Sequence, residues 1–357
     1  MLSGQFATKE EGEGFDFFLN FAIKDISGVF DSPFWQRELL QATHHHPAIR
    51  HGVIAVGTMH RRYTSCQGDS TDNLFLDRQL QFALEQSNRA IQELMKSTKA
   101  APPSESNLKT IMTCCILFST LACLQGEQHE ALNHIRYGLK LMKELITMVF
   151  SMPNPMSTWY CHPVTLKSLR RTFLGLNVQA LSILGSASLT HWEKIPAHFL
   201  ENCQSIAIHW VSLECAQHYW ESLLSNTLAF AQGAMDMTDV NGLGDAEGLG
   251  TWDNSTPELV IAHLQERFQT GISRLHRHFP EVFRETADPN AIIIRLICAQ
   301  VELFLMVLTS TEDGARNPDD EEPFEALMDL VTRLEDSLVE YRETVCKLVI
   351  LPLHDPY

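Results

Sequence analysis

Apolar residues recur every three or four positions along most of the 357-residue chain, which is the spacing of one face of an α-helix. No stretch shows the strict apolar and polar alternation, with β-branched enrichment, that is typical of a strand. The pattern predicts an all-α protein whose antiparallel helix pairs pack as an irregular bundle or a short solenoid. The predicted helices cover about residues 14–29, 34–45, 48–63, 73–97, 107–125, 128–149, 165–188, 203–236, 257–279, 289–310 and 323–347.

Turn-forming residues separate these helices. Pro102 and Pro103 end the fourth predicted helix, because proline cannot continue a helix in its interior. A glycine-rich acidic stretch at 238–256 interrupts the second half of the chain and predicts a flexible loop. We therefore expect three parts along the chain. They are a disordered N-terminal tail at 1–13, one helical domain at 14–350 that contains this loop, and a C-terminal tail at 351–357.

Charge argues against direct binding of nucleic acid. The chain has 27 lysines and arginines against 44 aspartates and glutamates, which gives a formal net charge of −17. Such a surface repels phosphate backbones, so we expect no direct nucleic-acid partner. The most apolar stretch, at 291–308, is interrupted by Arg295, Gln300 and Glu302 and predicts a buried helix rather than a membrane span.

The nine cysteines are scattered through apolar helical stretches, and no two of them have CxxC spacing. Cysteines in such positions are typical of small buried residues in a reducing compartment, not of a disulfide framework. The N-terminus shows neither the basic nor the apolar region of a secretory signal. We expect a protein of the nucleus or cytoplasm that is not inserted in a membrane.

Several separated segments carry a family resemblance. They are FDSPFW at 30–35, LLQATHHHPAIRHGVIAVGTMH at 39–60, a segment at 126–141 that contains HIRYGLKL, FLGLNVQA at 173–180, IRL at 294–296 and FEALMDL at 324–330. Together they resemble the fungal-specific transcription factor domain, the regulatory region of fungal zinc-cluster transcription factors, over about residues 14–350. Because the segments match in order, the resemblance is more specific than any single motif.

The resemblance implies a transcriptional regulator or co-regulator of a fungal metabolic gene cluster, secondary metabolism included. Members of this family usually carry an N-terminal zinc cluster and continue beyond a segment similar to ILPL at 350–353. The 357 residues contain no tight array of cysteines that could hold a zinc cluster. We therefore expect a regulator without its own DNA-binding module, which acts through a protein partner such as a complete zinc-cluster factor. The oligomeric state is left open.

The histidines are the first candidates for a metal site. His44, His45 and His46 are consecutive, and successive side chains on a helix diverge by about 100°. They cannot converge on one ion without other ligands, so we interpret them as packing or capping residues. His129 and His134 resemble a zinc-protease motif but are five positions apart, where the four-residue spacing of HExxH is needed to share a helix face.

The acidic run DDEE at 319–322 is the main candidate for divalent-ion chemistry, because adjacent carboxylates can hold Mg²⁺ against a diphosphate. It also precedes Pro323 at a predicted helix start, where negative charge complements the helix dipole. The alternative function is a recruited enzyme, since fold does not fix function. This would be a non-canonical, Mg²⁺-dependent sesquiterpene cyclase of the humulene type that acts on farnesyl diphosphate. Its metal ligands would be Asp319 and Asp320, and its diphosphate contact Arg295.

Four aromatic residues, Trp192, Trp210, Tyr219 and Trp220, are interpreted as core residues, with the lining of an apolar pocket as the alternative. The chain contains no GxSxG elbow and no P-loop. The leading hypothesis therefore assigns no catalytic residue, no cofactor and no metal. Regulator, recruited enzyme and truncated relic of a longer gene stay open as alternatives at this stage.

Overall fold

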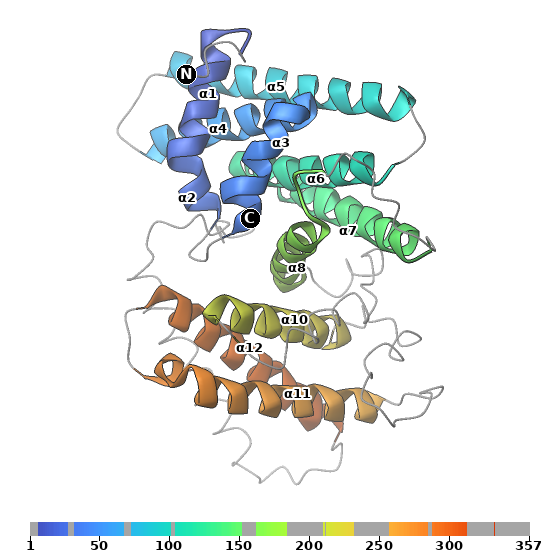
Figure 1. Ribbon diagram of the computed structural model, residues 1–357. Helices are drawn as coiled ribbons and strands as arrows, with labels where there is room; N and C mark the ends of the chain where they lie inside the picture. The colour runs from blue at the N-terminus through green and yellow to red at the C-terminus, as the bar shows by residue number, and fades with distance from the viewer. Residues whose placement is uncertain are drawn as a thin grey trace. The chain divides into compact units, whose positions relative to one another are not determined.

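The computed structural model describes residues 6–27, 32–67, 73–100, 104–151, 162–183, 210, 212–231, 257–284, 288–312 and 332. These residues form helices and connecting turns, with no strand among them, which confirms the all-α prediction (Figure 1). The chain divides into two compact units, unit 1 (residues 1–173 and 347–357) and unit 2 (residues 174–346). The predicted single domain over residues 14–350 stays a prediction.

Unit 1 is organised around one central helix. Its elements are α1 (Lys9–Phe17), η1 (Phe18–Ala22), α2 (Ile23–Ile26), η2 (Phe34–Glu38), α3 (Leu39–His45), α4 (Pro47–Gln67), α5 (Asn73–Ala100), α6 (Glu105–Gln125) and α7 (Gln128–Ser151). α4 contacts α1, η1, α3, α5 and α6, while α6 packs along α7. Figure 1 shows α5 beside α4 and the α6–α7 pair in the same unit.

Side-chain caps determine where the first helix begins. The Thr8 hydroxyl accepts a hydrogen bond from the Glu11 backbone N–H (3.2 Å), and the Glu11 carboxylate accepts one from the Ala7 N–H (2.9 Å). These reciprocal bonds satisfy N–H groups that lack a partner inside the helix. α1 therefore begins at Lys9, and the expected tail at 1–13 is wrong for residues 9–13.

A glycine turn joins α6 to α7. Gly126 has a φ of 80°, a left-handed conformation that glycine adopts without steric cost. The Gly126 N–H donates to the Cys123 carbonyl (3.0 Å) and the Glu127 N–H donates to the Ala122 carbonyl (2.9 Å). These two bonds satisfy carbonyl groups in the last turn of α6. The turn also reverses the chain, so α6 and α7 form one of the predicted antiparallel pairs.

Two short π-helical segments interrupt the N-terminal helices. In η1 the Ile23 N–H donates to the Phe18 carbonyl, and in η2 the Leu39 N–H donates to the Phe34 carbonyl. Both bonds span five residues instead of the four of an α-helix. Phe18 and Phe34 are fully or almost fully buried, so the widened turns direct large rings into the core of unit 1.

Glycines allow α1 and α4 to approach closely. A Cβ atom at Gly57 would lie 2.2 Å from the Gly14 carbonyl oxygen and 2.8 Å from the Phe18 Cβ. A Cβ at Gly14 would lie 2.6 Å from the Thr58 hydroxyl oxygen. The two helices therefore meet almost backbone to backbone, with no room for a side chain at either glycine.

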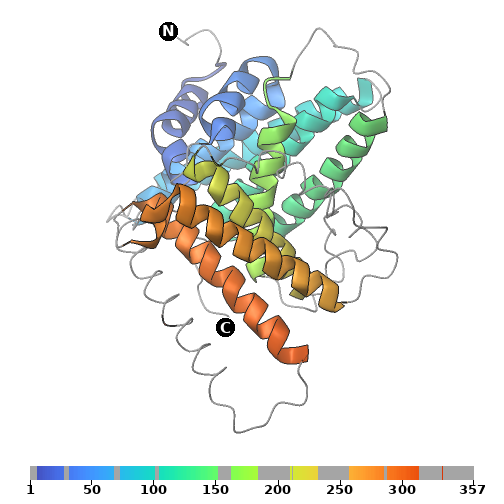
Figure 2. The same ribbon diagram turned by 60° about the horizontal axis from the view of Figure 1, so that its bottom comes forward.

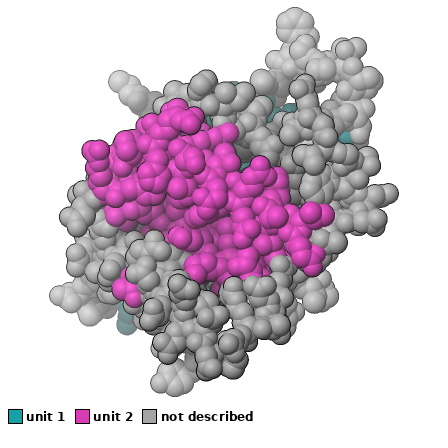
Figure 3. All heavy atoms as spheres, turned by 90° about the horizontal axis from the view of Figure 1, so that it is seen from below, with its two compact units in different colours: residues 1–173, 347–357 teal, residues 174–346 magenta. Residues whose placement is uncertain are grey.

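The described part of unit 2 includes three neighbouring helices, α10 (Leu213–Ala231), α11 (Pro257–His278) and α12 (Pro289–Glu312), and the 3₁₀ turn η5 (Pro280–Phe283). Each of the three helices contacts the other two, and Figure 2 shows them side by side. α8 (Leu166–Ile183) begins in unit 1 and ends in unit 2, where the Asn177 amide donates to the Ser225 hydroxyl of α10 (3.0 Å). The described atoms of unit 2 form a continuous area on one face in Figure 3.

The predicted helix at 203–236 is wrong at its start. Trp210 and Ser212 are not helical, and α10 begins at Leu213. The Ser212 hydroxyl accepts a hydrogen bond from the Cys215 N–H (3.3 Å) and so caps the helix. The predicted helix at 323–347 and the loop at 238–256 lie outside the described residues, except for the helical residue Thr332.

Two of the described helices, α6 and α12, are long and apolar enough to cross a membrane by length and composition alone. In α6, 72% of the apolar window is buried within the protein, and in α12 the share is 39%. Core helices of soluble proteins pass the same test, and the burial of α6 identifies it as a core helix. The absence of a membrane partner stays a prediction.

Candidate functional site

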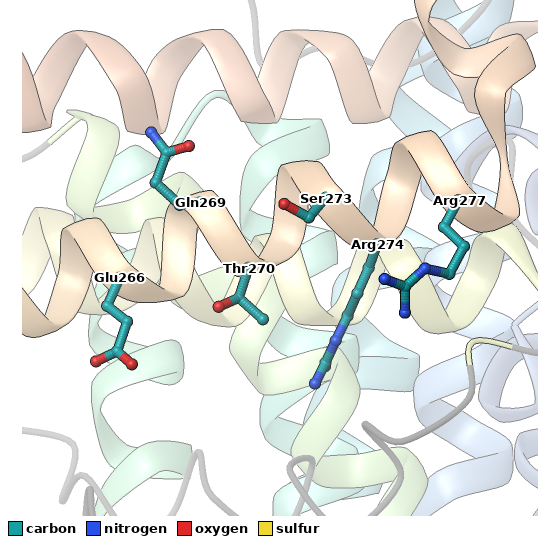
Figure 4. Close-up of a pocket in the computed structure, with 6 residues that line it drawn as sticks. All are labelled: Glu266, Gln269, Thr270, Ser273, Arg274 and Arg277. Atoms are coloured by element: carbon teal, nitrogen blue, oxygen red, sulfur yellow. The ribbon is translucent and has the colours of Figure 1, made fainter.

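The described part of unit 2 presents a cluster of arginines on the exposed side of α11. A hollow of about 340 Å³ on this side is lined by Glu266, Gln269, Thr270, Ser273, Arg274 and Arg277. Figure 4 shows the Arg274 and Arg277 side chains pointing the same way from the helix, together with those of Glu266 and Thr270. We call these six residues the α11 arginine surface.

Helical periodicity creates this surface. Val260, Leu264, Phe268 and Leu275 of α11 are buried and contribute to the core of unit 2. Each residue advances about 100° around the helix, so these four share one side while the lining residues share the other. The amphipathic pattern of α11 therefore turns the arginines toward solvent.

Aromatic rings hold two arginines in place. The Arg274 guanidinium carbon lies 6.0 Å from the ring centroid of Trp210 and 6.0 Å from that of Tyr219. The Arg267 guanidinium carbon lies 5.7 Å from the Tyr219 centroid, and the Tyr219 hydroxyl donates to the Arg267 carbonyl oxygen (2.5 Å). Ring faces attract guanidinium groups and restrict their motion. These contacts hold the two arginines in a limited set of positions.

A glycine lets the aromatic residues reach α11. A Cβ at Gly271 would lie 2.7 Å from the Trp220 ring and 2.7 Å from the Tyr219 ring. Trp220 is fully buried, and its ring packs edge to face with Phe268 at a centroid distance of 5.5 Å. Trp220 therefore packs in the core of unit 2, and its neighbour Tyr219 contacts the arginines.

The electrostatics of the surface differ from those of the whole chain. Arg267, Arg274, Arg277 and Arg284 follow one another on α11 and just after it, in a chain of net charge −17. Among the described residues, no carboxylate forms an ion pair with these arginines. Burial raises the pKa of the Tyr219 hydroxyl, although Arg267 and Arg274 oppose this rise, so the hydroxyl stays protonated at neutral pH.

This arrangement can bind anionic groups. Guanidinium groups match carboxylate and phosphate oxygens, and the hydroxyls of Thr270 and Ser273 add donors beside them. No set of three or more metal-ligating His, Cys, Asp or Glu side chains comes together within the described ranges. The α11 arginine surface therefore offers donors suited to negatively charged groups, beside the Glu266 carboxylate in the same lining.

Unit 1 contains a second polar feature, the buried cluster of His46, Thr110 and His162. The Thr110 hydroxyl lies 3.3 Å from Nδ1 of His46 and 3.1 Å from Nε2 of His162. The two imidazole rings stack with centroids 4.5 Å apart and an interplanar angle of 30°. The cluster joins three segments of unit 1 that are far apart in the sequence.

The hydrogen bonds of this cluster require a neutral His162. The Val164 N–H donates to Nδ1 of His162 (3.0 Å), so this nitrogen is an acceptor and the ring proton is on Nε2. Thr110 donates in turn to the Ser106 carbonyl (3.0 Å) and can accept from both rings. The pKa of His162 is lowered to about 3, mainly by burial, with His46 and Lys109 also lowering it and a backbone contact with Val164 raising it. The cluster is a structural connection, since His162 does not take up a proton near neutral pH.

The structure agrees with the packing and capping interpretation of the consecutive histidines. His44 and His45 are exposed in the last turn of α3, where basic groups complement the helix dipole. His46 has an extended backbone (φ −122°, ψ 100°), as expected for a residue before proline. Burial lowers the pKa of His46, with His45 adding to the effect.

The residues of the cyclase alternative are not brought together by the described structure. Asp319 and Asp320 lie outside the described residues, and so does Trp192. Arg295 is half-buried on α12. The Mg²⁺ site and the diphosphate contact therefore stay predictions.

Buried cysteines are poor candidates for a nucleophile. Burial raises the pKa of Cys115 to about 12 and that of Cys123 to about 11. The pKa of Cys114 rises further because Cys115 adds to the effect of burial. Thiols of this kind stay protonated at neutral pH.

Sequence reasoning missed the α11 arginine surface. The signal was present, because residues 267, 274 and 277 are seven and three positions apart, a spacing that keeps arginines near one helix side. Trp210 is a buried core residue as predicted, while the contacts of Trp210 and Tyr219 with these arginines were not foreseen. Trp220 is a core residue as predicted.

Comparison with known proteins gives one family and one curated relative. The family described as "Fungal specific transcription factor domain" matches residues 14–245. The "Aspercryptin biosynthesis cluster-specific transcription regulator atnN" of Emericella nidulans is 31% identical over 158 residues, which cover 44% of this chain and 24% of that protein. The aligned part is thus about a quarter of the relative's length. No solved structure matches the chain.

Proposed function

This chain belongs to the fungal-specific transcription factor domain family, and from this premise we propose that it regulates transcription through contacts with a protein partner. The match over residues 14–245, which covers most of the chain, is the observation that carries the proposal. Arg274, which is half-buried, and Arg277, which is exposed, support the second part, because neither forms an ion pair among the described residues. The site of action is the nucleus.

The pathway belongs to the proposal as well. The E. nidulans relative is a regulator specific to one biosynthesis gene cluster, and its similarity extends over 44% of this chain. By analogy, the protein controls genes of a secondary-metabolite cluster. Deleting its gene should change the transcript levels of one contiguous group of genes at least about fivefold. Unchanged levels throughout the genome would remove the regulatory proposal.

Partner dependence can be tested with purified components. The net charge of −17 and the absence of a zinc-cluster cysteine array in the 357 residues support an indirect route to DNA. We expect the protein alone to leave promoter fragments unshifted in a gel, and to supershift a complex of DNA with a complete zinc-cluster factor. Sequence-specific binding by the purified protein alone would contradict this part of the proposal.

The cyclase alternative has an equally direct test. Incubation of the purified protein with farnesyl diphosphate and Mg²⁺ should release a volatile sesquiterpene if the alternative is right, and the Asp319→Ala and Asp320→Ala variants should release none. No described residue contact favours this function over regulation. Absence of product from the wild-type protein would exclude the cyclase alternative, and the regulatory proposal would then stand by itself.

A further inference from the structure

We propose that the α11 arginine surface binds an acidic peptide segment of a protein partner. This inference rests on the proposed function, in which the chain acts through protein contacts, and it names the chemistry of the partner. The surface offers Arg274 and Arg277 one helical turn apart, with Thr270 and Ser273 between or beside them. Figure 4 shows the two arginine side chains directed to the same side.

The spacing of the arginines suits a run of carboxylates. Arg267 and Arg274 are two helical turns apart, which is about 10 Å along the helix axis. Arg277 follows after one further turn, and Arg284 after η5. An extended peptide advances about 3.3 Å per residue, so acidic side chains at every second or third position can meet successive arginines.

The arginines are held before any partner binds. Arg274 lies over the rings of Trp210 and Tyr219, and the Tyr219 hydroxyl is bonded to the backbone of α11. Groups that are already restricted lose less conformational freedom on binding. Arg274, which the two rings restrict, therefore loses less conformational freedom on binding a carboxylate than a flexible surface arginine would.

An exposed apolar side chain follows α11 in the sequence. Phe283 is 39% exposed, and its ring stacks on His276 with centroids 4.1 Å apart and an interplanar angle of 13°. His276 lies in the last turn of α11, one residue before Arg277. The Leu and Phe residues of the probe peptide used below allow for apolar contacts of this kind.

The openness of the hollow favours a peptide over a small anion. All six lining residues belong to one helix, so an isolated phosphate or carboxylate would keep most of its water. A peptide gains from several contacts at once.

Fluorescence anisotropy with the full-length protein tests the proposal. The probe is a fluorescein-labelled 12-residue peptide in which Asp and Glu alternate with Leu and Phe, and its matched control replaces every Asp by Asn and every Glu by Gln. We expect the acidic peptide to bind at least about tenfold tighter than its control, with affinity falling as salt rises from 50 to 300 mM. Equal binding of both peptides overturns the proposal.

Variants assign the binding to the surface. The Arg274→Gln, Arg277→Gln double variant should lose about tenfold or more in peptide affinity, while Arg78→Gln, at an exposed position of α5, should lose less than twofold. Circular dichroism confirms that each variant is folded. Where the double variant does not fold, Arg277→Glu alone replaces it, because Arg277 makes no described ion pair. Unchanged affinity in a folded variant overturns the proposal.

Competition experiments distinguish the acidic peptide from two other anionic ligands, diphosphate and duplex nucleic acid. Inorganic diphosphate at 5 mM should leave most of the peptide bound, and a 20-base-pair duplex should not displace it at peptide-like concentrations. Full displacement by either one overturns the peptide assignment. A transcription assay on the double variant distinguishes the two proposals. If the variant loses peptide binding but keeps the transcript response, the α11 arginine surface is not the partner site, while the regulatory function stands. If the wild-type protein binds the peptide but changes no transcript level, the regulatory function is refuted, while the peptide site stands.

Discussion

Units 1 and 2 place their basic side chains in opposite ways. In unit 1, Arg89 lies 2.7 Å from the buried carboxylate of Glu11, and Lys109 lies 2.6 Å from Glu105. Lys9, Arg61 and Lys96 of the same unit form further ion pairs with Glu13 and Glu93. In unit 2, Arg274 instead lies over two aromatic rings at the edge of an open hollow. Unit 1 uses charge to hold its own helices together, whereas in unit 2 Arg274 and Arg277 line a hollow and form no ion pair among the described residues.

The close helix crossings at Gly57 in unit 1 and at Gly271 in unit 2 also differ. α1 and α4 of unit 1 meet at Gly14 and Gly57 with a backbone carbonyl as the nearest obstacle. α10 and α11 of unit 2 meet at Gly271, where the obstacles are the rings of Tyr219 and Trp220. Backbone cannot move without disturbing a whole helix, while a ring can tilt. These two crossings therefore differ in what surrounds the glycine, backbone at Gly57 and rings at Gly271, and the measurements below compare the two units.

The largest expected effect is at Gly57. Gly57→Ala places a methyl group 2.2 Å from a backbone oxygen, and we expect it to lower the free energy of unfolding by about 3 kcal/mol. Gly271→Ala meets only side chains, so its expected cost is about 1–2 kcal/mol. Urea unfolding followed by circular dichroism measures both.

Gly175→Ala is the matched control for these two variants. No atom lies within 4 Å of a Cβ at this helical position. The substitution should stabilise the protein by about 0.5–1 kcal/mol, because alanine favours helix over glycine. If Gly271→Ala cost more than Gly57→Ala, the contrast between backbone and ring crossings would be wrong.

Neutralising one arginine in each unit should have unequal effects on stability. Arg89→Gln leaves the buried Glu11 carboxylate with only the Gln86 amide and the Ala7 N–H, and we expect a loss of about 2 kcal/mol. Arg274→Gln should cost about 0.5 kcal/mol, since only contacts with ring faces are removed. Urea unfolding compares the two, and a double-mutant cycle with Glu11→Gln isolates the ion pair. Equal losses for both arginines would contradict the comparison.

Acid should weaken unit 1 through His162. The ordinary histidine pKa of 6.5 applies to the unfolded chain, whereas burial lowers the folded value to about 3. Below pH 6.5 the unfolded chain therefore binds a proton that the folded chain rejects, and stability falls as the pH falls toward 3. Between pH 7.0 and 5.5 this residue should account for a loss of about 1 kcal/mol.

Thermal unfolding of wild type and His162→Gln at the two pH values measures this contribution. The variant should lose less stability on acidification than the wild type, and His129→Gln, at an exposed position of α7, should behave as the wild type. An identical pH response in wild type and His162→Gln would show that the buried cluster does not exclude the proton.

The smallest expected effect concerns the aromatic support of the α11 arginine surface. Tyr219→Phe keeps the ring but removes the hydrogen bond to the Arg267 carbonyl, so we expect a loss of about 0.5–1 kcal/mol. Peptide affinity should fall no more than about threefold, since Arg274 still lies over the ring. A larger loss of affinity than of stability would mean that the hydroxyl itself meets the ligand.

Much of the fold could be predicted from spacing alone. The long helices α4, α6, α7, α11 and α12 lie within a few residues of their predicted positions, because each carries a sustained apolar periodicity. The start of α1 was missed although Thr8 and Glu11 have the spacing of a capping box. The predicted start of α10 was too early because the periodicity continues across the cap at Ser212.

The candidate site could be predicted only in part. The arginines at 267, 274 and 277 form a visible pattern, but their stacking on Trp210 and Tyr219 depends on how α10 packs against α11. The contact between His46 and His162 likewise joins positions more than a hundred residues apart. Local sequence carries no information on such pairs, because tertiary packing brings them together.

The two π-helical segments also bear on how this chain diverged. A turn closed across five residues, as at η1 and η2, contains one residue more than the α-helical turn it replaces. Single-residue insertions and deletions between relatives should therefore be tolerated at these two turns and rejected within α4. An alignment that opens one-residue gaps at 18–22 and 34–38 would preserve the register of the buried rings on both sides.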